Sequence, residues 1–409
     1  MENWKRNCVF FLASQSISLL GSALVQTAIA WYITLTTKSG LMMSISIVCG
    51  ILPTFFVSLF AGVWADRYNR KLVIIFSDCF IALSTFVVAI LFILGYTSIP
   101  LLFVLLVLRA IGTGIQTPAV NAVLPQFVPD DKLTKINGIN TSIQAATMIL
   151  SPMLSAALLT SSSIITVFFV DVVTAALAIF VLTLLKVPPL IKADTTGENT
   201  GFFDDLMSGF KYIHKSTFLK KFFLVYSTTY ILFTPINFLT ILQTARLYGD
   251  ALWKMTAIEI AISVGMIIGG IIVSVKTFFN NNTYMIILAC FISGICTFIL
   301  GLPIPFMVYL TFLLIAGVVV PFFSASVTST LQRRVSQDYL GRIFGVSNLL
   351  SNLVMSFGMI LMGPAADMLN IGLIFLICGV LFIIQGICIY FSKEMIKMGD
   401  MSDLTKTEQ

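Results

Sequence analysis

Four ionisable side chains interrupt apolar stretches of the sequence that are long enough to cross a lipid bilayer: Asp78, Arg109, Asp171 and Glu259. On insertion scales such a group costs about 2.5–3.5 kcal/mol at mid-membrane, so it usually pairs with another group, faces water or moves ions. A carboxyl group there can bind and release a proton or hold a cation. The single histidine, His214, lies in a polar stretch, so proton chemistry inside the membrane would depend on carboxyl groups.

Depth along the apolar stretches favours one ion pair. Arg109 lies about 10 residues and Asp171 about 8 residues from the outer ends of their spans, so at 1.5 Å per residue their heights agree within roughly 3 Å. We expect them to pair, either as a permanent structural contact or as part of proton coupling. Asp78, about 7 residues from the cytoplasmic end of its span, is a poorer match in height. Glu259, near an outer end, could carry a proton, anchor a cationic substrate or belong to the outer rim.

The composition defines the elements that must position these groups. Of the 409 residues, 58% are hydrophobic and only 10% are charged, whereas a soluble domain carries about 25% charged residues. This composition excludes a water-soluble enzyme, a nucleic-acid binder and a disordered scaffold. All seven cysteines stand singly in apolar stretches, so the sequence indicates neither a disulfide framework nor a metal site.

We predict an all-α polytopic membrane protein with twelve transmembrane helices in two pseudo-symmetric six-helix halves. The N-terminal half covers residues 1–187, and a cytoplasmic linker with a short amphipathic helix covers 188–218. The C-terminal half covers 219–392 and a cytoplasmic tail covers 393–409. The expected spans lie near 9–35, 42–63, 72–95, 100–122, 137–160, 163–186, 219–243, 255–277, 283–301, 304–328, 343–364 and 371–391.

The distribution of Lys and Arg predicts the orientation. With a cytoplasmic N-terminus, 20 of the 24 Lys and Arg residues fall on the cytoplasmic side, three fall outside and Arg109 lies in the membrane. We therefore expect both termini to be cytoplasmic.

The chain also repeats itself at about half its length. Shifting the sequence by 207 residues lays 128–140 over 335–347, with Asp131 on Asp338 and Gly138 on Gly345. Both stretches link an even span to the next odd one on the cytoplasmic side. Two parallel six-helix repeats are the architecture of alternating-access carriers.

The loop between the second and third spans carries the sharpest motif, Gly62-Val-Trp-Ala-Asp66-Arg67-Tyr-Asn69-Arg70-Lys71. Gly62 allows close helix approach and Asp66 can cap a helix N-terminus. This motif resembles the signature of the major facilitator superfamily, Gly-x-x-x-Asp-Arg/Lys-x-Gly-Arg/Lys-Arg/Lys. Asn69 replaces the usual Gly, and Asn is the next most tolerant of a left-handed conformation. The resemblance implies a gating role for the loop, through Gly62, Asp66, Arg67, Arg70 and Lys71.

Two further stretches resemble motifs of the same superfamily. Gly138, Ser151 and Pro152 in the fifth span match a degraded form of its antiporter motif, although packing by small residues explains the pattern equally. In the fourth span, Arg109 resembles the arginine of another motif, but Gly112 comes one residue early and the usual Gln is missing.

Polar and aromatic side chains mark candidate walls of a substrate cavity. The superfamily places the first, fourth, seventh and tenth spans around a central cavity, and an alternative role for the polar stripes is hydrogen bonding between helices. The candidates are Gln15, Ser18, Ser22 and Gln26 in the first span, Tyr226, Tyr230 and Asn237 in the seventh, and Phe322 and Phe323 in the tenth.

Across nearly its whole length the chain is similar to the bacterial macrolide-efflux subgroup of the superfamily. The stretches that carry this similarity are 117–123, 151–152 and 338–344. The resemblance implies a secondary active exporter of bulky amphipathic drugs in the bacterial cell membrane, driven by the proton gradient without a cofactor. A basic amine on such a drug would compete with protons for Glu259 or Asp171. We expect a monomer in the lipid bilayer, with an accessory ATP-binding protein as an optional partner, and neither nucleic acid nor nucleotide as a ligand, since no P-loop occurs.

Two other interpretations stay open at this point. The chain could carry another solute, such as a metabolite, a peptide or a siderophore. It could also be a membrane sensor or assembly partner that transports nothing, but the half-repeat and the complete gating loop favour a carrier.

Overall fold

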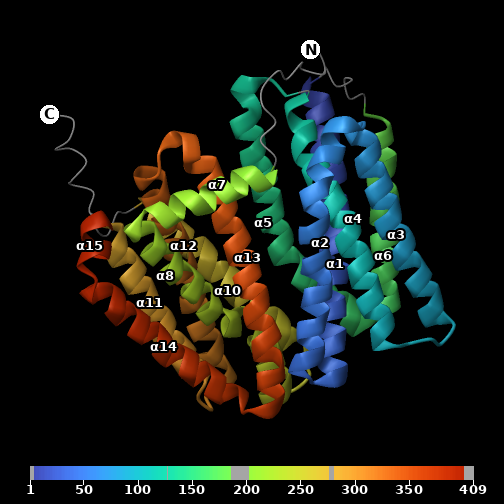
Figure 1. Cartoon of the computed structure of the whole chain (residues 1–409). Helices are drawn as coiled ribbons and strands as arrows, with labels where there is room; N and C mark the ends of the chain where they lie inside the picture. The colour runs from blue at the N-terminus through green and yellow to red at the C-terminus, as the bar shows by residue number, and fades with distance from the viewer. Residues whose placement is uncertain (1–3, 127, 186–201, 276–280, 400–409) are drawn as a thin grey trace. The chain divides into compact units, whose positions relative to one another are not determined.

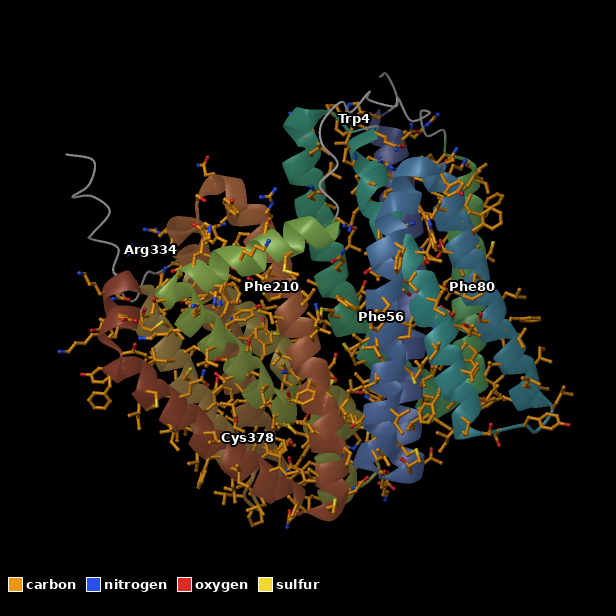
Figure 2. All side chains as sticks on the ribbon, viewed as in Figure 1. Trp4, Phe56, Phe80, Phe210, Arg334 and Cys378 are labelled. Atoms are coloured by element: carbon orange, nitrogen blue, oxygen red, sulfur yellow. The ribbon has the colours of Figure 1, made fainter. Side chains whose placement is uncertain are left out.

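A computed structural model describes residues 4–126, 128–185, 202–275 and 281–399. Helices account for nearly all of these residues (Figure 1). Twelve of the helical segments are long and apolar enough to cross a membrane, which confirms the expected number of spans. Large apolar side chains remain exposed along them, such as Phe56 at 54% and Phe80 at 39% (Figure 2). Such exposure suits helices that face lipid, because acyl chains are as apolar as these side chains.

The chain divides into two compact units, residues 1–38 with 42–196 and residues 39–41 with 197–409. The helices of the first unit are α1 (Trp4–Thr37), α2 (Gly40–Arg67), α3 (Arg70–Ile93), α4 (Ile99–Val123), α5 (Asp130–Ser161) and α6 (Ile164–Thr183). The first two residues of α2 group with the second unit. A single 3₁₀ turn, η1 (Leu124–Gln126), follows α4.

The second unit begins with α7 (Phe202–Lys215), followed by one interrupted span made of α8 (Thr217–Thr234), the π-helical segment η2 (Pro235–Leu239) and α9 (Thr240–Leu247). Four long spans come next, α10 (Leu252–Val275), α11 (Asn282–Leu300), α12 (Phe306–Arg334) and α13 (Gln337–Met368). The unit ends with α14 (Ile371–Phe391) and the short α15 (Lys393–Gly399).

Most span boundaries lie close to those predicted, but α5 begins at Asp130, seven residues before the expected start at 137. Its first turns consist largely of polar residues, from Asp130 to Lys135. Hydropathy locates the apolar part of a helix and not its hydrogen-bonded end, because a helix can continue into the interface without a change in backbone geometry. This extension shapes the surface groove described below.

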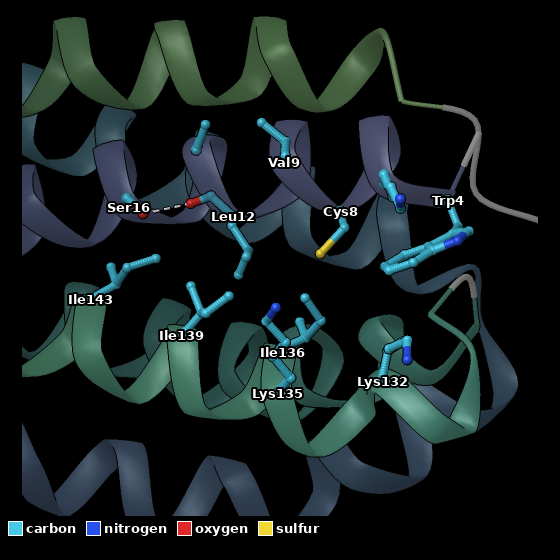
Figure 3. A pocket seen from close by; sticks show the side chains of 12 residues that line it. Trp4, Cys8, Val9, Leu12, Ser16, Lys132, Lys135, Ile136, Ile139 and Ile143 are labelled. Carbon is cyan, nitrogen blue, oxygen red and sulfur yellow. Dashed lines mark hydrogen bonds between the residues drawn. The ribbon is translucent and has the colours of Figure 1, made fainter.

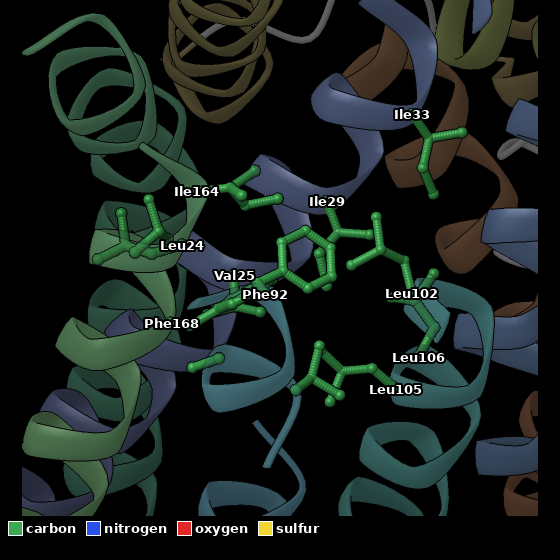
Figure 4. Close-up of a cluster of buried hydrophobic side chains, with 14 residues drawn as sticks. Leu24, Val25, Ile29, Ile33, Phe92, Leu102, Leu105, Leu106, Ile164 and Phe168 are labelled. Carbon is green, nitrogen blue, oxygen red and sulfur yellow. The ribbon is translucent and has the colours of Figure 1, made fainter. Parts of the chain in front are cut away.

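A buried apolar cluster holds α1, α3, α4 and α6 together in the first unit (Figure 4). Val25 and Ile29 of α1 are fully buried in it, and the rings of Phe92 and Phe168 meet edge to face with centroids 5.7 Å apart. The cluster fills one end of the unit with side chains that need no polar partner.

Small residues form a close helix contact in the second unit, between α10 and α12. Gly265 and Gly269 form a Gly-x-x-x-Gly pair that faces Gly317. A Cβ atom added to Gly269 would lie 2.8 Å from the backbone carbon of Val318. Because the obstacle is backbone, the helices would have to move apart. Small-residue faces of this kind let membrane helices approach closely.

We expect Gly269→Ala to lower the free energy of unfolding by about 1–3 kcal/mol, the usual cost of overpacking. Gly270→Ala is the matched control, because nothing lies within 4 Å of the added atom and Ala favours the helix by about 1 kcal/mol over Gly. Thermal unfolding of the purified protein in detergent measures both. Equal midpoints for the two variants would contradict the close contact.

Candidate functional site

Two polar layers cross the interior of the first unit where α3 and α4 pack against each other. Gln116 of α4 donates to Asp78 of α3, and Arg109 of α4 donates to Thr85 of α3. Asp78 and Thr85 are seven residues apart, and so are Arg109 and Gln116. Seven residues make about two helical turns, or roughly 10.5 Å. The antiparallel register of the two helices therefore produces two polar layers, two turns apart.

The first layer is an ion pair between Arg109 and Asp171 of α6, as the residue depths led us to expect. Their side chains are only 5% and 2% exposed. The Thr85 hydroxyl accepts a hydrogen bond from Arg109 at 2.5 Å and donates to Asp171 at 3.1 Å. The guanidinium also donates to the backbone carbonyl of Ser22 on α1, at 3.3 Å. Four helices thus meet at one buried charge pair whose polar atoms satisfy one another.

The second layer centres on Asp78, which is 2% exposed. One carboxyl oxygen, Oδ1, accepts hydrogen bonds from Ser18 of α1 at 2.7 Å and from Gln116 at 2.8 Å. The other oxygen, Oδ2, is buried and has no hydrogen-bond partner among the described residues. Asp78 also takes part in no ion pair of the described chain. Buried polar atoms are normally paired, so an unpartnered carboxyl oxygen is a candidate site for a bound proton.

Two neighbouring polar atoms share this property. The hydroxyl of Ser77, beside Asp78, and the amide nitrogen of Gln15, one helical turn before Ser18, are buried and unpartnered within the described residues. Like Asp78 Oδ2, they are buried polar atoms of α1 and α3 that the described residues leave without a partner. Water molecules commonly bind such groups.

The gating loop differs locally from the expectation. Asn69 has extended backbone angles, with φ −64° and ψ 110°, and its side chain caps α3 by accepting from the amide of Lys71 at 3.1 Å. No left-handed turn forms there, because a side-chain cap replaces the glycine turn. Asp66 lies within the last turn of α2, and the N-cap of α3 is Asn69. The surroundings of Gly62 and the side chains of Asp66 and Arg67 lie outside the described part of the structure.

The remaining loop cations bind the ends of other helices. Arg70 donates to the carbonyl of Ala122 at 2.7 Å, near the end of α4. Lys71 donates to the carbonyls of Thr183 at 2.9 Å and Leu185 at 2.7 Å, at the end of α6. Helix C-termini have unsatisfied carbonyls and a negative dipole end, so both contacts are favourable. The loop therefore connects α3 to α4 and α6 within the first unit.

The antiporter-like residues of α5 form a tight contact with α1. Ser151 is 3.0 Å from the Thr27 hydroxyl, and Ser155 donates to the Leu24 carbonyl at 3.1 Å. Pro152 lies inside the helix. Gly138 does not take part in the contact, because a Cβ atom added there would meet nothing within 4 Å. The C-terminal part of the motif makes the contact, whereas Gly138 at its start does not.

The predicted cavity residues of α1 face different surroundings. Ser18 points into the polar layer around Asp78, and Ser22 contributes its carbonyl to Arg109. Gln26 is exposed, and Gln15 is half-buried. Ser18 and Ser22 therefore take part in hydrogen bonds inside the unit, whereas the side chain of Gln26 is exposed.

The aromatic candidates of the second unit form one cluster. Phe323 of α12 lies 6.3 Å from the ring of Tyr226 and 6.2 Å from that of Tyr230, and the two tyrosine rings are 4.8 Å apart. Tyr226 and Phe323 are buried, while Tyr230 and Phe322 are half-buried. Asn237 is exposed and lies in the π-helical segment, where its amide bonds the carbonyl of Phe233. Such segments frequently occur at functional sites.

Glu259 of α10 is half-buried and makes no hydrogen bond or ion pair within the described chain. The nearest cations in the sequence have other partners. Arg246 pairs with Asp367 at 2.5 Å, and Lys254 donates to the carbonyl of Tyr248. Glu259 thus retains its capacity to receive a cation.

Sequence reasoning missed Thr85 and Gln116, which complete the two polar layers. Both lie seven residues from a charged residue on the same helix, Thr85 after Asp78 and Gln116 after Arg109. That spacing keeps two side chains on nearly the same helix face. A search along the faces that carry the buried charges would have found them.

Twelve apolar helices around buried charges define a polytopic membrane protein of the carrier type. The chain belongs to the major facilitator superfamily of transporters, whose family model, described as Major Facilitator Superfamily, matches residues 11–359. Among solved structures, the nucleoside transporter NupG superposes with a TM-score of 0.71 at 16% identity, covering 95% of this chain and 98% of that one. This likeness shows the shared fold.

Two relatives are similar to this chain over most of its length, and not only at the family motifs. A protein of Streptococcus pyogenes named Macrolide efflux protein A is 30% identical over 403 residues, which cover 97% of this chain and 98% of the relative. A protein of the same name from Enterococcus faecalis is 29% identical over 327 residues, covering 78% of this chain and 99% of the relative.

We expect Asp171→Asn to lower the free energy of unfolding by about 3–5 kcal/mol, because it leaves the Arg109 cation buried without its anion. Asp78→Asn, at a similarly buried aspartate that has no cation, should leave the unfolding midpoint nearly unchanged. The double variant Arg109→Gln/Asp171→Asn should recover part of the loss. Thermal unfolding in detergent measures all three, and equal losses for Asp78→Asn and Asp171→Asn would contradict the distinction.

Proposed function

We propose that this protein is a proton-coupled exporter of bulky amphipathic drugs of the macrolide type. The observation that carries the proposal is similarity over 97% of the chain to a protein named Macrolide efflux protein A. The aromatic cluster of the second unit and the low charge of the spans suit a ligand with much apolar surface and few polar groups, because such sites are mostly apolar.

Asp78 is the carboxyl group best placed to carry the coupling proton. An ionised carboxylate buried without a cation costs several kcal/mol, whereas a protonated one is neutral. Oδ1 is held by Ser18 and Gln116, so the proton resides on the unpartnered Oδ2. In the transport cycle Asp78 binds a proton from the side of higher proton concentration and releases it to the other side.

Asp171 is a poor carrier in comparison, because protonation would break its contact with Arg109 and leave that cation buried alone. We therefore assign Asp171 a structural role. Glu259, which has no partner within the described residues, is then the carboxyl group available to a basic amine on the drug. Proton and drug amine would bind different carboxyl groups, Asp78 and Glu259.

Cells that express the protein should accumulate less labelled macrolide than cells that lack it, and a protonophore should abolish the difference. The measurement is intracellular label at verified expression. Unchanged accumulation would remove the macrolide assignment and favour a carrier of another solute. A difference that the protonophore leaves intact would remove the proton coupling.

In proteoliposomes, Asp78→Asn should reduce drug uptake driven by a pH gradient to the level of protein-free vesicles, while drug-for-drug exchange continues. The amide preserves the shape and the acceptor oxygen but cannot exchange a proton. Glu259→Gln is the matched control and should retain uptake of an uncharged drug under the same gradient. Full coupling in Asp78→Asn would exclude Asp78 as the proton carrier.

A further inference from the structure

An open groove runs between the first halves of α1 and α5, with a volume of about 670 Å³ (Figure 3). One wall comes from α1 between Trp4 and Ser16, and the other from α5 between Lys132 and Ile143. None of the residues that form the two polar layers lines it. The groove is thus separate from the groups assigned to proton coupling.

The groove lies on the N-terminal side of a hydrogen-bonded contact between the two helices. Thr27 and Leu24 of α1 contact Ser151 and Ser155 of α5. Towards the N-termini the two helices share a buried cluster that includes Cys8, Leu12 and Ile136, whereas an added Cβ atom at Gly138 would meet nothing within 4 Å. The apolar walls there remain partly uncovered, with Val9 66% and Ile139 40% exposed.

Charge is concentrated at the N-terminal end of the groove. Lys5 of α1 and Lys132 and Lys135 of α5 line the groove, with Lys5 over the Trp4 ring and Lys132 opposite that indole (Figure 3). The N-termini of α1 and α5 lie at the same end, and their dipoles add to the positive potential. From Cys8 and Leu12 to Ile143 the lining is almost entirely apolar.

The length of the groove corresponds to one leaflet of a bilayer. Twelve residues separate Trp4 from Ser16, which at 1.5 Å per residue is about 18 Å. Half of a hydrocarbon core is about 15 Å thick. A headgroup at the lysines would therefore place an acyl chain along the apolar walls.

We propose that this groove binds an anionic phospholipid, with its phosphate at Lys5, Lys132 and Lys135 and an acyl chain against Val9, Ile139 and Ile143. Basic pockets between transmembrane helices bind anionic headgroups in this manner. The three lysines disfavour a cationic drug, so the site is distinct from a drug site. The inference does not depend on the transported solute.

The decisive variant is Lys132→Gln/Lys135→Gln in the full-length protein. Lys393→Gln/Lys397→Gln is the matched control, because it removes the same charge from two exposed lysines of α15, outside the groove. Native mass spectrometry of protein released from mixed micelles measures retained phosphatidylglycerol against phosphatidylcholine. We expect the preference for phosphatidylglycerol to fall about fivefold for each groove lysine removed and to stay unchanged in the control.

A phosphatidylglycerol with a photoreactive group in its acyl chain locates the site directly. Cross-links should concentrate on peptides that contain Val9 or Ile139, and Ile139→Trp, which fills the groove, should remove them. Inorganic phosphate should not compete, because it lacks the acyl chain. Equal loss of preference in both lysine variants, cross-links spread evenly over the spans, or stronger labelling by phosphatidylcholine would each overturn the proposal.

Discussion

The buried contact between Arg109 and Asp171 constrains the rest of the first unit. A charge pair at this depth is tolerated only when every polar atom around it finds a partner. Thr85 supplies one partner from α3 and the Ser22 carbonyl another from α1, so four helices are held in one register. That register also places Gln116 against Asp78, two turns away. Because Asp171 engages Arg109, Asp78 has no cation partner among the described residues. The chemistry available at Asp78 is thus a consequence of the ion pair.

The sequence was sufficient for the spans, for the family and for the pairing of Arg109 with Asp171, because each follows from a property of single segments: apolar length, motif or depth. The sequence did not predict which residues donate hydrogen bonds to Asp78. Gln116 lies on another helix, and nothing in either segment fixes the rotation and the offset at which α3 and α4 pack. Those two quantities depend on the summed fit of many side chains, such as Ile81 of α3 against Gly112 of α4.

In the gating loop, the backbone conformation of Asn69 differs from the one that the family signature suggested. The comparison with a glycine-containing signature suggested a left-handed residue at Asn69, but an asparagine side chain can satisfy a helix N-terminus directly. The extended backbone and the bond to the Lys71 amide show that it does so. Replacing Gly by Asn therefore changes how the turn is stabilised, while Arg70 and Lys71 still reach the ends of α4 and α6.

One helix, α5, shows how a degraded motif can retain part of its physical effect. Its small residues around Ser151 and Ser155 permit a close contact with α1, as glycines would, and hydroxyl hydrogen bonds add to that contact. Further towards its N-terminus Gly138 faces open space, so the motif no longer joins the helices there. Towards their N-termini these two parallel helices share a buried cluster but also carry exposed apolar side chains, which an apolar molecule would cover. The lysines of this region lie at its N-terminal end. An amphiphile with an anionic head can therefore pair with the lysines and also cover the apolar walls. An uncharged apolar molecule or a cationic drug can contact the walls but cannot form an ion pair with the lysines.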